Sequence, residues 1–235
     1  DLMMKNILVL GNLPLATKVI KHVLNHPKAN LAGVVVPEED KAYPSSDGET
    51  CAYAFAKKER IPILKIKDIS GEHEFDLAIS ARNNDILQAW FLKKFSIGVV
   101  NCHGGYLPDY KGVGGHIFPI INGEGYSGGT IHWMSEKVDN GDIIERRLVP
   151  IGTNETGCSL FVKINDVLFD LIEENFDQII RGTAECIPQK KLEHSNSKRK
   201  SYFYYKKDLA NLFKKNELTE VEKRALFWPF KDPLN

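Results

Sequence analysis

The sequence lacks the short motifs that identify several large classes of enzyme. Its first apolar segment, Lys5 to Leu10, leads into GNLPLA instead of the G-x-G-x-x-G turn, whose glycines let the backbone approach a pyrophosphate. Neither a P-loop nor an H-E-x-x-H motif occurs in the 235 residues. A nicotinamide cofactor is therefore not expected, and nothing indicates P-loop phosphoryl transfer or a zinc protease.

Cysteine pairs, long apolar runs and an overall charge are also missing. The four cysteines show no C-x-x-C spacing, which is typical of reduced thiols and not of disulfides or zinc ligands. No apolar run approaches the roughly 20 residues of a membrane span, and no signal peptide is recognisable. The formal net charge is zero, so the molecule as a whole has no electrostatic attraction for nucleic acid. We therefore expect a cytoplasmic protein that binds neither membranes nor nucleic acid.

Short segments rich in valine and isoleucine alternate with amphipathic segments as far as Pro188. Strands are predicted at residues 5–10, 31–36, 76–80, 97–101, 129–134 and 143–151, and helices at 11–27, 49–62, 84–95 and 156–182. Strands that alternate with helices in this way form a mostly parallel sheet with helices on both faces. The sequence therefore predicts an α/β, Rossmann-like fold for residues 1–189, with a short appendage at residues 190–235.

The appendage differs from the rest of the chain in charge and in aromatic content. It carries 12 Lys and Arg against 6 Asp and Glu, a charge of +6, and the remainder carries −6. Eight aromatic residues lie in the same segment, and Thr219 to Glu222 forms a capping box for a last helix. Basic and aromatic side chains together suit a phosphate and a flat ring, but they also suit a solvated helix beside a small satellite core. Both interpretations stay open, as does a dimer-forming hairpin with its own apolar patch.

One loop, GVVNCHGGYLPDYKGVGG from Gly98 to Gly115, follows a predicted buried strand. Asn101 and His103 are two residues apart, so they project on the same side of an extended backbone, and Cys102 projects on the other. In open α/β sheets, ligands bind beyond the carboxyl ends of strands. An amide donor and an imidazole there can hold an oxyanion and move a proton. The alternative is a turn-forming Asn beside a surface His.

A second segment, GGTIHWMSEKVDNGDII from Gly128 to Ile144, presents two acids around Gly141. Asp139 and Asp142 are either turn formers, or one of them orients the His103 ring.

Together the two segments, NCHGGYLPDYKG and TIHWMSEKVDNGDII, resemble the folate-dependent N-formyltransferase family over roughly Ile7 to Ile187. The resemblance implies Asn101, His103 and Asp139 as the catalytic residues, N10-formyltetrahydrofolate as the formyl donor, and no metal. It also implies a pteridine slot lined by the backbone of residues 84–88 and 138–142, with Asn84, Ile86, Leu87, Gln88, Val138 and Asp142 as the binding residues. The loop departs from the family pattern at Gly104, Gly105 and in KGVGGH, where Lys111 replaces the family's arginine.

The acceptor is expected to be a sugar nucleotide. Methionyl-tRNA formyltransferases add a C-terminal domain of about a hundred residues, whereas about 45 follow Pro188 here, and GNLPLATK lacks the Gly/Ser-rich turn of glycinamide ribonucleotide formyltransferases. The chain is most similar to sugar N-formyltransferases, which implies a dTDP-amino-dideoxyhexose of the dTDP-4-amino-4,6-dideoxyglucose type, used for O-antigen or another surface glycan. The expected acceptor-binding residues are Gly104, Gly105, Tyr110, Lys111, Lys200, Tyr204 and Trp228. A homodimer is expected, and the two other acceptors or a non-catalytic binding module are the alternatives.

Overall fold

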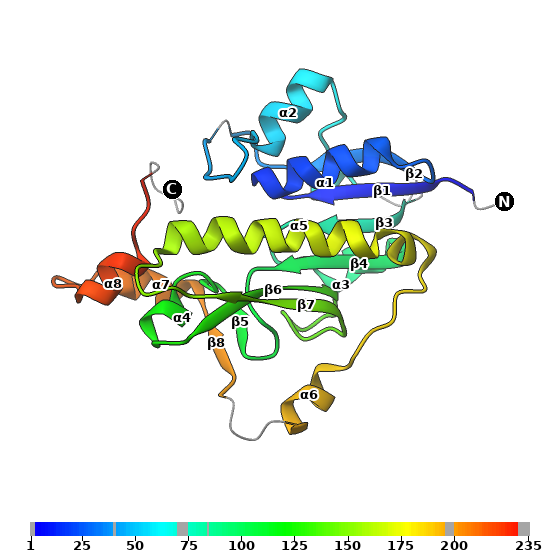
Figure 1. Cartoon of the computed structure of the whole chain (residues 1–235). Helices are drawn as coiled ribbons and strands as arrows, with labels where there is room; N and C mark the ends of the chain where they lie inside the picture. Colours follow the sequence, from blue (N-terminus) through cyan, green and yellow to red (C-terminus); the bar gives the residue numbers. More distant parts are fainter. Residues whose placement is uncertain (1–2, 40, 70–74, 84, 196–199, 230–235) are drawn as a thin grey trace.

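A computed structural model describes residues 3–39, 41–69, 75–83, 85–195 and 200–229, and its centre is a mixed six-stranded sheet (Figure 1). The strand order is β2-β1-β3-β4-β6-β7. The strands are β1 (Lys5–Leu10), β2 (Ala29–Val35), β3 (Phe75–Ser80), β4 (Phe95–His103), β6 (Tyr126–Trp133) and β7 (Ile143–Pro150). The first four are parallel, whereas β6 and β7 join them as an antiparallel extension.

Helices cover both faces of the sheet, which confirms the predicted fold class. On one face α1 (Pro14–Asn25) and α5 (Gly157–Arg181) run side by side over the larger core, with α2 (Ala52–Glu59) packed on α1 (Figure 1). The other face carries a smaller core beneath the short α3 (Ala89–Leu92) and a 3-10 turn, η1 (Ile66–Asp68). None of the helices in the described ranges is long and apolar enough to cross a bilayer.

The long helix α5 begins and ends where its sequence predicts. Thr156 caps the N-terminus, because its side chain accepts from the backbone N–H of Ser159, and Ser159 accepts in return from Thr156 N. Gly182 ends the helix in the left-handed region, with φ 68°. The sequence predicts a helix over residues 84–95, but only Ala89–Leu92 is helical, as α3. Gln88 has an extended backbone at the N-cap position of α3, and Leu87 is buried in the smaller core.

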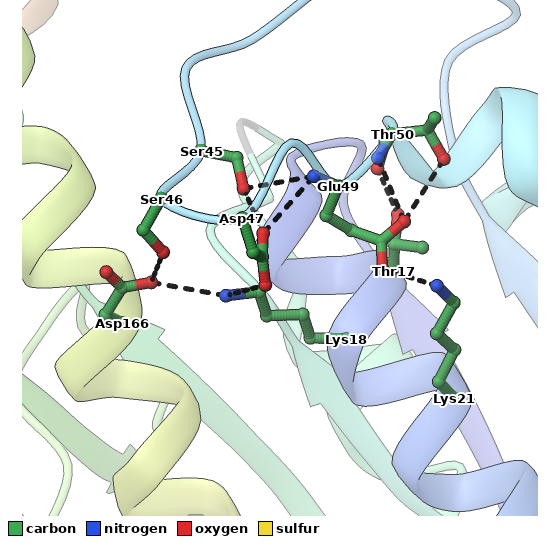
Figure 2. A network of polar contacts seen from close by, with 9 residues as sticks. All are labelled: Thr17, Lys18, Lys21, Ser45, Ser46, Asp47, Glu49, Thr50 and Asp166. Atoms are coloured by element: carbon green, nitrogen blue, oxygen red, sulfur yellow. Dashed lines mark hydrogen bonds and ion pairs between the residues drawn. The ribbon is translucent and has the colours of Figure 1, made fainter.

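A network of polar side chains fastens the segment between β2 and α2 to the two long helices (Figure 2). The Lys18 ammonium on α1 lies 2.9 Å from Asp47 and 3.2 Å from Asp166 on α5. The Thr17 hydroxyl donates to the Thr50 carbonyl at 2.6 Å. The network holds this segment across the N-terminal part of α1.

The appendage packs against the predicted site loop instead of standing apart. Its elements are α6 (Gln189–Ser195), β8 (Tyr202–Tyr204), α7 (Lys206–Phe213) and α8 (Glu220–Ala225), and its partners include β5 (Tyr110–Gly112) and α4 (Phe118–Ile121). Strand β8 pairs in parallel with β5, which the residue pattern did not predict. The capping box of α8 is confirmed: Thr219 accepts from Glu222 N at 3.2 Å, and Glu222 accepts from Thr219 N at 2.9 Å. The division at residue 189 stays a prediction.

Candidate active site

Two of the three predicted catalytic residues lie at the carboxyl end of β4. Asn101 and His103 lie on one side of this strand, and Cys102 points into the main core with 1% of its surface exposed. Burial raises the pKa of the Cys102 thiol to about 12. A thiol in this state cannot act as a nucleophile near neutral pH.

His103 lies between a carboxylate and a carbonyl group. Its Nδ1 is 3.4 Å from Asp139 Oδ2, and its Nε2 is 2.8 Å from the Tyr110 carbonyl oxygen. A Cβ on Gly105 would lie 2.7 Å from Nε2, so only glycine leaves room for the ring. Because both nitrogens face oxygen acceptors, an imidazolium ring can donate a hydrogen bond at each end.

Asp139 is held in place from the opposite loop. Its backbone adopts φ 49°, a conformation that Asp and Asn tolerate better than most residues. The backbone N–H of Gly112 donates to Asp139 Oδ2 at 2.8 Å. The carboxylate that contacts His103 is therefore oriented by the β5 segment, and β5 is itself paired with the appendage.

His132 joins the three predicted residues, although sequence reasoning gave it no role. Strand pairing sets it opposite Asn101, and its Nε2 lies 3.1 Å from Asn101 Nδ2 and 3.8 Å from Asp139 Oδ1. Burial lowers the pKa of His132 to about 4, so the ring is neutral near pH 7. In the tautomer that carries its proton on Nδ1, the ring N–H donates to the Trp133 carbonyl at 3.0 Å. Nε2 is then free to accept a hydrogen bond from the Asn101 amide. The available signal was the histidine of the second motif, T-I-H-W-M.

This geometry suits acyl transfer. The Asn101 amide carries two hydrogens, and one of them is hydrogen-bonded to His132. Asn101 is also partly exposed. The other hydrogen is suited to a developing oxyanion. The His103–Asp139 pair can carry a proton beside it. Within the described ranges, no group of three or more His, Cys, Asp or Glu side chains is arranged to hold a metal ion.

The predicted pteridine-binding residues differ in their exposure to solvent. A hollow of about 500 Å³ is lined by residues 133–137 and 140–142, and thus by the exposed Asp142. Val138 and Ile86 are exposed, and Gln88 is exposed where it caps α3. The Leu87 side chain is buried in the smaller core, so any contact of this residue with a pteridine is made by its backbone, and that contact stays a prediction. Asn84 lies outside the described residues.

The loop residues expected to hold the acceptor also divide into two groups. Gly104 and Gly105 are buried within their own loop. Lys111 Nζ donates to Asn140 Oδ1 at 3.1 Å and so joins the two site loops. The Tyr110 ring is 4% exposed and belongs to the main core. A ring so buried offers little surface to an acceptor, and the acceptor contact expected of Tyr110 stays a prediction. Its backbone carbonyl nevertheless contacts His103.

The three predicted residues of the appendage behave differently from one another. Lys200 is exposed just before β8. One face of the Tyr204 ring stacks on Phe118 with centroids 3.6 Å apart, and the ring is partly exposed, so its predicted acceptor contact stays a prediction. Trp228 is partly exposed and packs edge-on against Phe161 of α5, with centroids 5.0 Å apart. Its position beside α5 is compatible with the predicted acceptor contact.

A serine in G-x-S-x-G spacing, Ser127 between Gly125 and Gly129, has no place in this site. It lies within strand β6, is 1% exposed, and donates to the Gly115 carbonyl at 2.6 Å. The nucleophile elbow that this spacing forms elsewhere is a sharp turn between a strand and a helix, and Ser127 is not on such a turn.

Comparison with known proteins agrees with the geometry of the site. Residues 5–171 match a family model described as formyl transferase. A methionyl-tRNA formyltransferase from Lactiplantibacillus plantarum is 36% identical over 137 residues, which are 55% of this chain and 43% of that protein. The chain spans about half the length of the curated relatives it matches.

Two solved structures illustrate the shared fold. An N-formyltransferase from Helicobacter canadensis, in complex with folinic acid and dTDP-3-aminofucose, is 24% identical, with a TM-score of 0.72 over 94% of this chain and 78% of that one. A phosphoribosylglycinamide formyltransferase from Streptococcus pneumoniae TIGR4 is 24% identical, with a TM-score of 0.59 over 75% of this chain and 99% of that one. Since the family model matches most of the sequence, this chain belongs to the formyl transferase family.

Proposed function

We propose that the protein transfers a formyl group from N10-formyltetrahydrofolate to the amine of a nucleoside-diphosphate-linked amino-dideoxy sugar, as a step toward O-antigen or another surface glycan. The observation that carries the proposal is the contact set of Asn101, His103 and Asp139 around the neutral His132 ring. Folate is the donor that the family implies, and the relative from Helicobacter canadensis binds folinic acid.

The residues divide the chemistry between them. The acceptor nitrogen forms a bond to the formyl carbon, and the carbonyl oxygen becomes an oxyanion. Asn101 donates its remaining amide N–H to that oxyanion, and one such donor contributes about 3 kcal/mol to a transition state. The intermediate collapses when the bond from the formyl carbon to N10 breaks. His103 moves the proton lost by the attacking nitrogen toward N10, and the Asp139 carboxylate stabilises the ring while it carries that proton.

The surroundings of the β1–α1 turn disfavour a phosphate at the start of α1. Asn12 is engaged there, because it donates to the Glu39 carbonyl at 3.3 Å and accepts from Tyr53 N at 2.8 Å. The segment across α1 also brings the carboxylates of Asp47 and Glu49 close to this helix (Figure 2). Carboxylates repel a phosphate, so capture of glycinamide ribonucleotide at this helix is a poor fit.

The appendage also supports a sugar-nucleotide acceptor. The N-formyltransferase from Helicobacter canadensis, solved with dTDP-3-aminofucose, covers 94% of this chain, against 75% for the phosphoribosylglycinamide enzyme. A fold shared over nearly the whole chain is consistent with an acceptor site that includes the appendage.

A second candidate, formylation of methionyl-tRNA, rests on one specific observation. The matched methionyl-tRNA formyltransferase shares 36% identity over 137 residues, which is higher than the identity to the solved sugar enzyme. The aligned part covers only 55% of this chain, however, and does not by itself distinguish acceptors that bind elsewhere.

One assay separates the candidates. The protein is mixed with N10-formyltetrahydrofolate and one acceptor at a time: dTDP-linked 3-amino and 4-amino dideoxyhexoses, glycinamide ribonucleotide, or methionyl-tRNA. Tetrahydrofolate release that requires a dTDP-amino sugar, with the formamide found by mass spectrometry, supports the proposal. Release with another acceptor only, or with none, contradicts it. Light scattering of the same sample tests the expected homodimer.

A further inference from the structure

Arg82 lies at a place in the sheet where ligands commonly bind, and it has no role in the chemistry above. It follows β3 by two residues, at the carboxyl edge where β3 and β2 flank β1 on opposite sides. The strand order reverses direction at this point, and the crevice beyond such a switch point is the usual ligand site of open α/β sheets. The backbone of Arg82 has φ 58°, which turns the chain away from the strand at once.

Neighbouring side chains hold the Arg82 guanidinium without neutralising it. Its Nη1 donates to Asn165 Oδ1 on α5 at 3.0 Å, and its Cζ lies 4.7 Å from the centre of the Phe161 ring. Arg82 forms no ion pair with any carboxylate in the described ranges. Burial lowers the pKa of Arg82 to about 10, so it remains charged near neutral pH. Arg82 is mostly buried but not fully covered. A mostly buried cation without an acidic partner in the described ranges is costly, unless an anion binds beside it.

The guanidinium is also close to the reacting groups. A Cβ on Gly104 would lie 2.8 Å from Arg82 Cζ, so this glycine leaves the space that the guanidinium occupies. Gly104 is the residue after His103. An anion on Arg82 would therefore lie close to the amine that His103 serves, as the phosphates of a nucleotide-linked sugar must.

Two further groups gather at the same phenyl ring. His116 and Trp228 both pack edge-on toward Phe161, with ring centroids 5.2 Å and 5.0 Å from it. His116 Nδ1 is buried and has no hydrogen-bond partner among the residues that the structure describes. Burial and the Arg82 charge lower the pKa of His116 to about 3, so it is a neutral ring able to donate or accept one hydrogen bond. The Arg82 guanidinium, the His116 imidazole and the Trp228 indole thus all contact the Phe161 ring of α5.

We propose that Arg82, held by Asn165 and Phe161, binds the phosphate chain of the acceptor, with His116 as a second polar contact. The planar fork of arginine matches two phosphate oxygens at once, which lysine cannot do. This inference rests on the proposed sugar-nucleotide acceptor and makes Arg82 its main phosphate-binding residue. Trp228, which packs on the same Phe161 ring, then lies within reach of the remainder of the nucleotide.

Binding of dTDP and of inorganic pyrophosphate, measured by calorimetry on the full chain, tests the proposal. Arg82→Gln should weaken dTDP binding about 10- to 100-fold, because charge-assisted bidentate bonds are lost. Arg82→Lys should recover only a small part of it. Folinic acid binding should be unchanged in both variants. Arg181→Gln, which removes an exposed guanidinium from the far end of α5, is the matched control and should behave as wild type.

Asn165→Asp separates anion binding from a structural role. It keeps the hydrogen bond to Arg82 but adds a carboxylate that competes with phosphate, so dTDP affinity should fall although the melting temperature does not. Unchanged dTDP affinity in Arg82→Gln and Asn165→Asp overturns the inference and leaves the proposed function intact. Wild-type protein that ignores dTDP but binds pyrophosphate through Arg82 contradicts the proposed acceptor and supports the anion site. Wild type that binds neither probe overturns the inference.

Discussion

Asp139→Asn isolates the charge of the carboxylate that faces His103. The variant keeps the size of the side chain, and asparagine accepts the left-handed backbone found there, φ 49°. Its amide oxygen can still accept from Gly112 N, the bond that now measures 2.8 Å. Folding should therefore be close to wild type, and only the pairing with a protonated His103 is lost.

The distance between the two groups sets the expected size of the effect. His103 Nδ1 and Asp139 Oδ2 are 3.4 Å apart, and each side chain is 9% exposed, so solvent screens the pair only weakly. Unit charges at about this distance interact by about 5 kcal/mol at an effective dielectric constant of about 20. Water that hydrates the imidazolium in the variant recovers part of this energy. A net loss of about 2–4 kcal/mol corresponds to a rate about 30- to 1000-fold lower.

Single-turnover formyl transfer to the acceptor found in the panel is the appropriate assay, with both substrates saturating. Thermal unfolding of the same samples checks that the variant is folded. Asp170→Asn, an exposed change on α5, serves as the control and should leave the rate unaltered. A rate for Asp139→Asn within threefold of wild type would refute the assignment of Asp139 as the partner of the proton-carrying imidazole.

Asn101→Ala should lower kcat by about 100-fold or more through loss of an oxyanion donor, whereas Cys102→Ser should remain active in the same assay; the opposite pattern would remove Asn101 from the mechanism. Gly112→Ala should destabilise the fold by about 3 kcal/mol in urea unfolding. The residue has φ 81°, and an added Cβ would clash with the Tyr204 carbonyl oxygen. A variant as stable as wild type would show that β5 and β8 do not pair. Stability should also fall as pH drops from 6.5 toward 4, because His132 stays neutral in the folded state and takes up a proton when unfolded. Denaturation at pH 7 and pH 4.5 should therefore show a smaller loss for His132→Gln than for wild type, and an equal loss would argue against a buried neutral ring.

Much of the catalytic site follows from local rules that a sequence carries. The two-residue period of a strand sends Asn101 and His103 to one side and Cys102 into the core, whichever strands lie beside β4. The capped and amphipathic pattern of α5 likewise depends on neighbours within a few residues, and both ends were predicted closely. The residue pattern left Asp139 and Asp142 as alternatives; the family resemblance implied Asp139, whose carboxylate lies 3.4 Å from His103 Nδ1.

The remaining features depend on contacts between segments far apart in the chain. His132 meets Asn101 because β4 and β6 pair antiparallel in one register, 31 residues apart in sequence. The ring of Tyr110 is buried by Tyr202 of the appendage, which no residue pattern near Tyr110 reveals. That Arg82 has no carboxylate partner within the described ranges is visible only once the side chains around it are in place. Periodicity reports which side of an element is buried, but register, ring stacking and charge pairing are decided by tertiary packing.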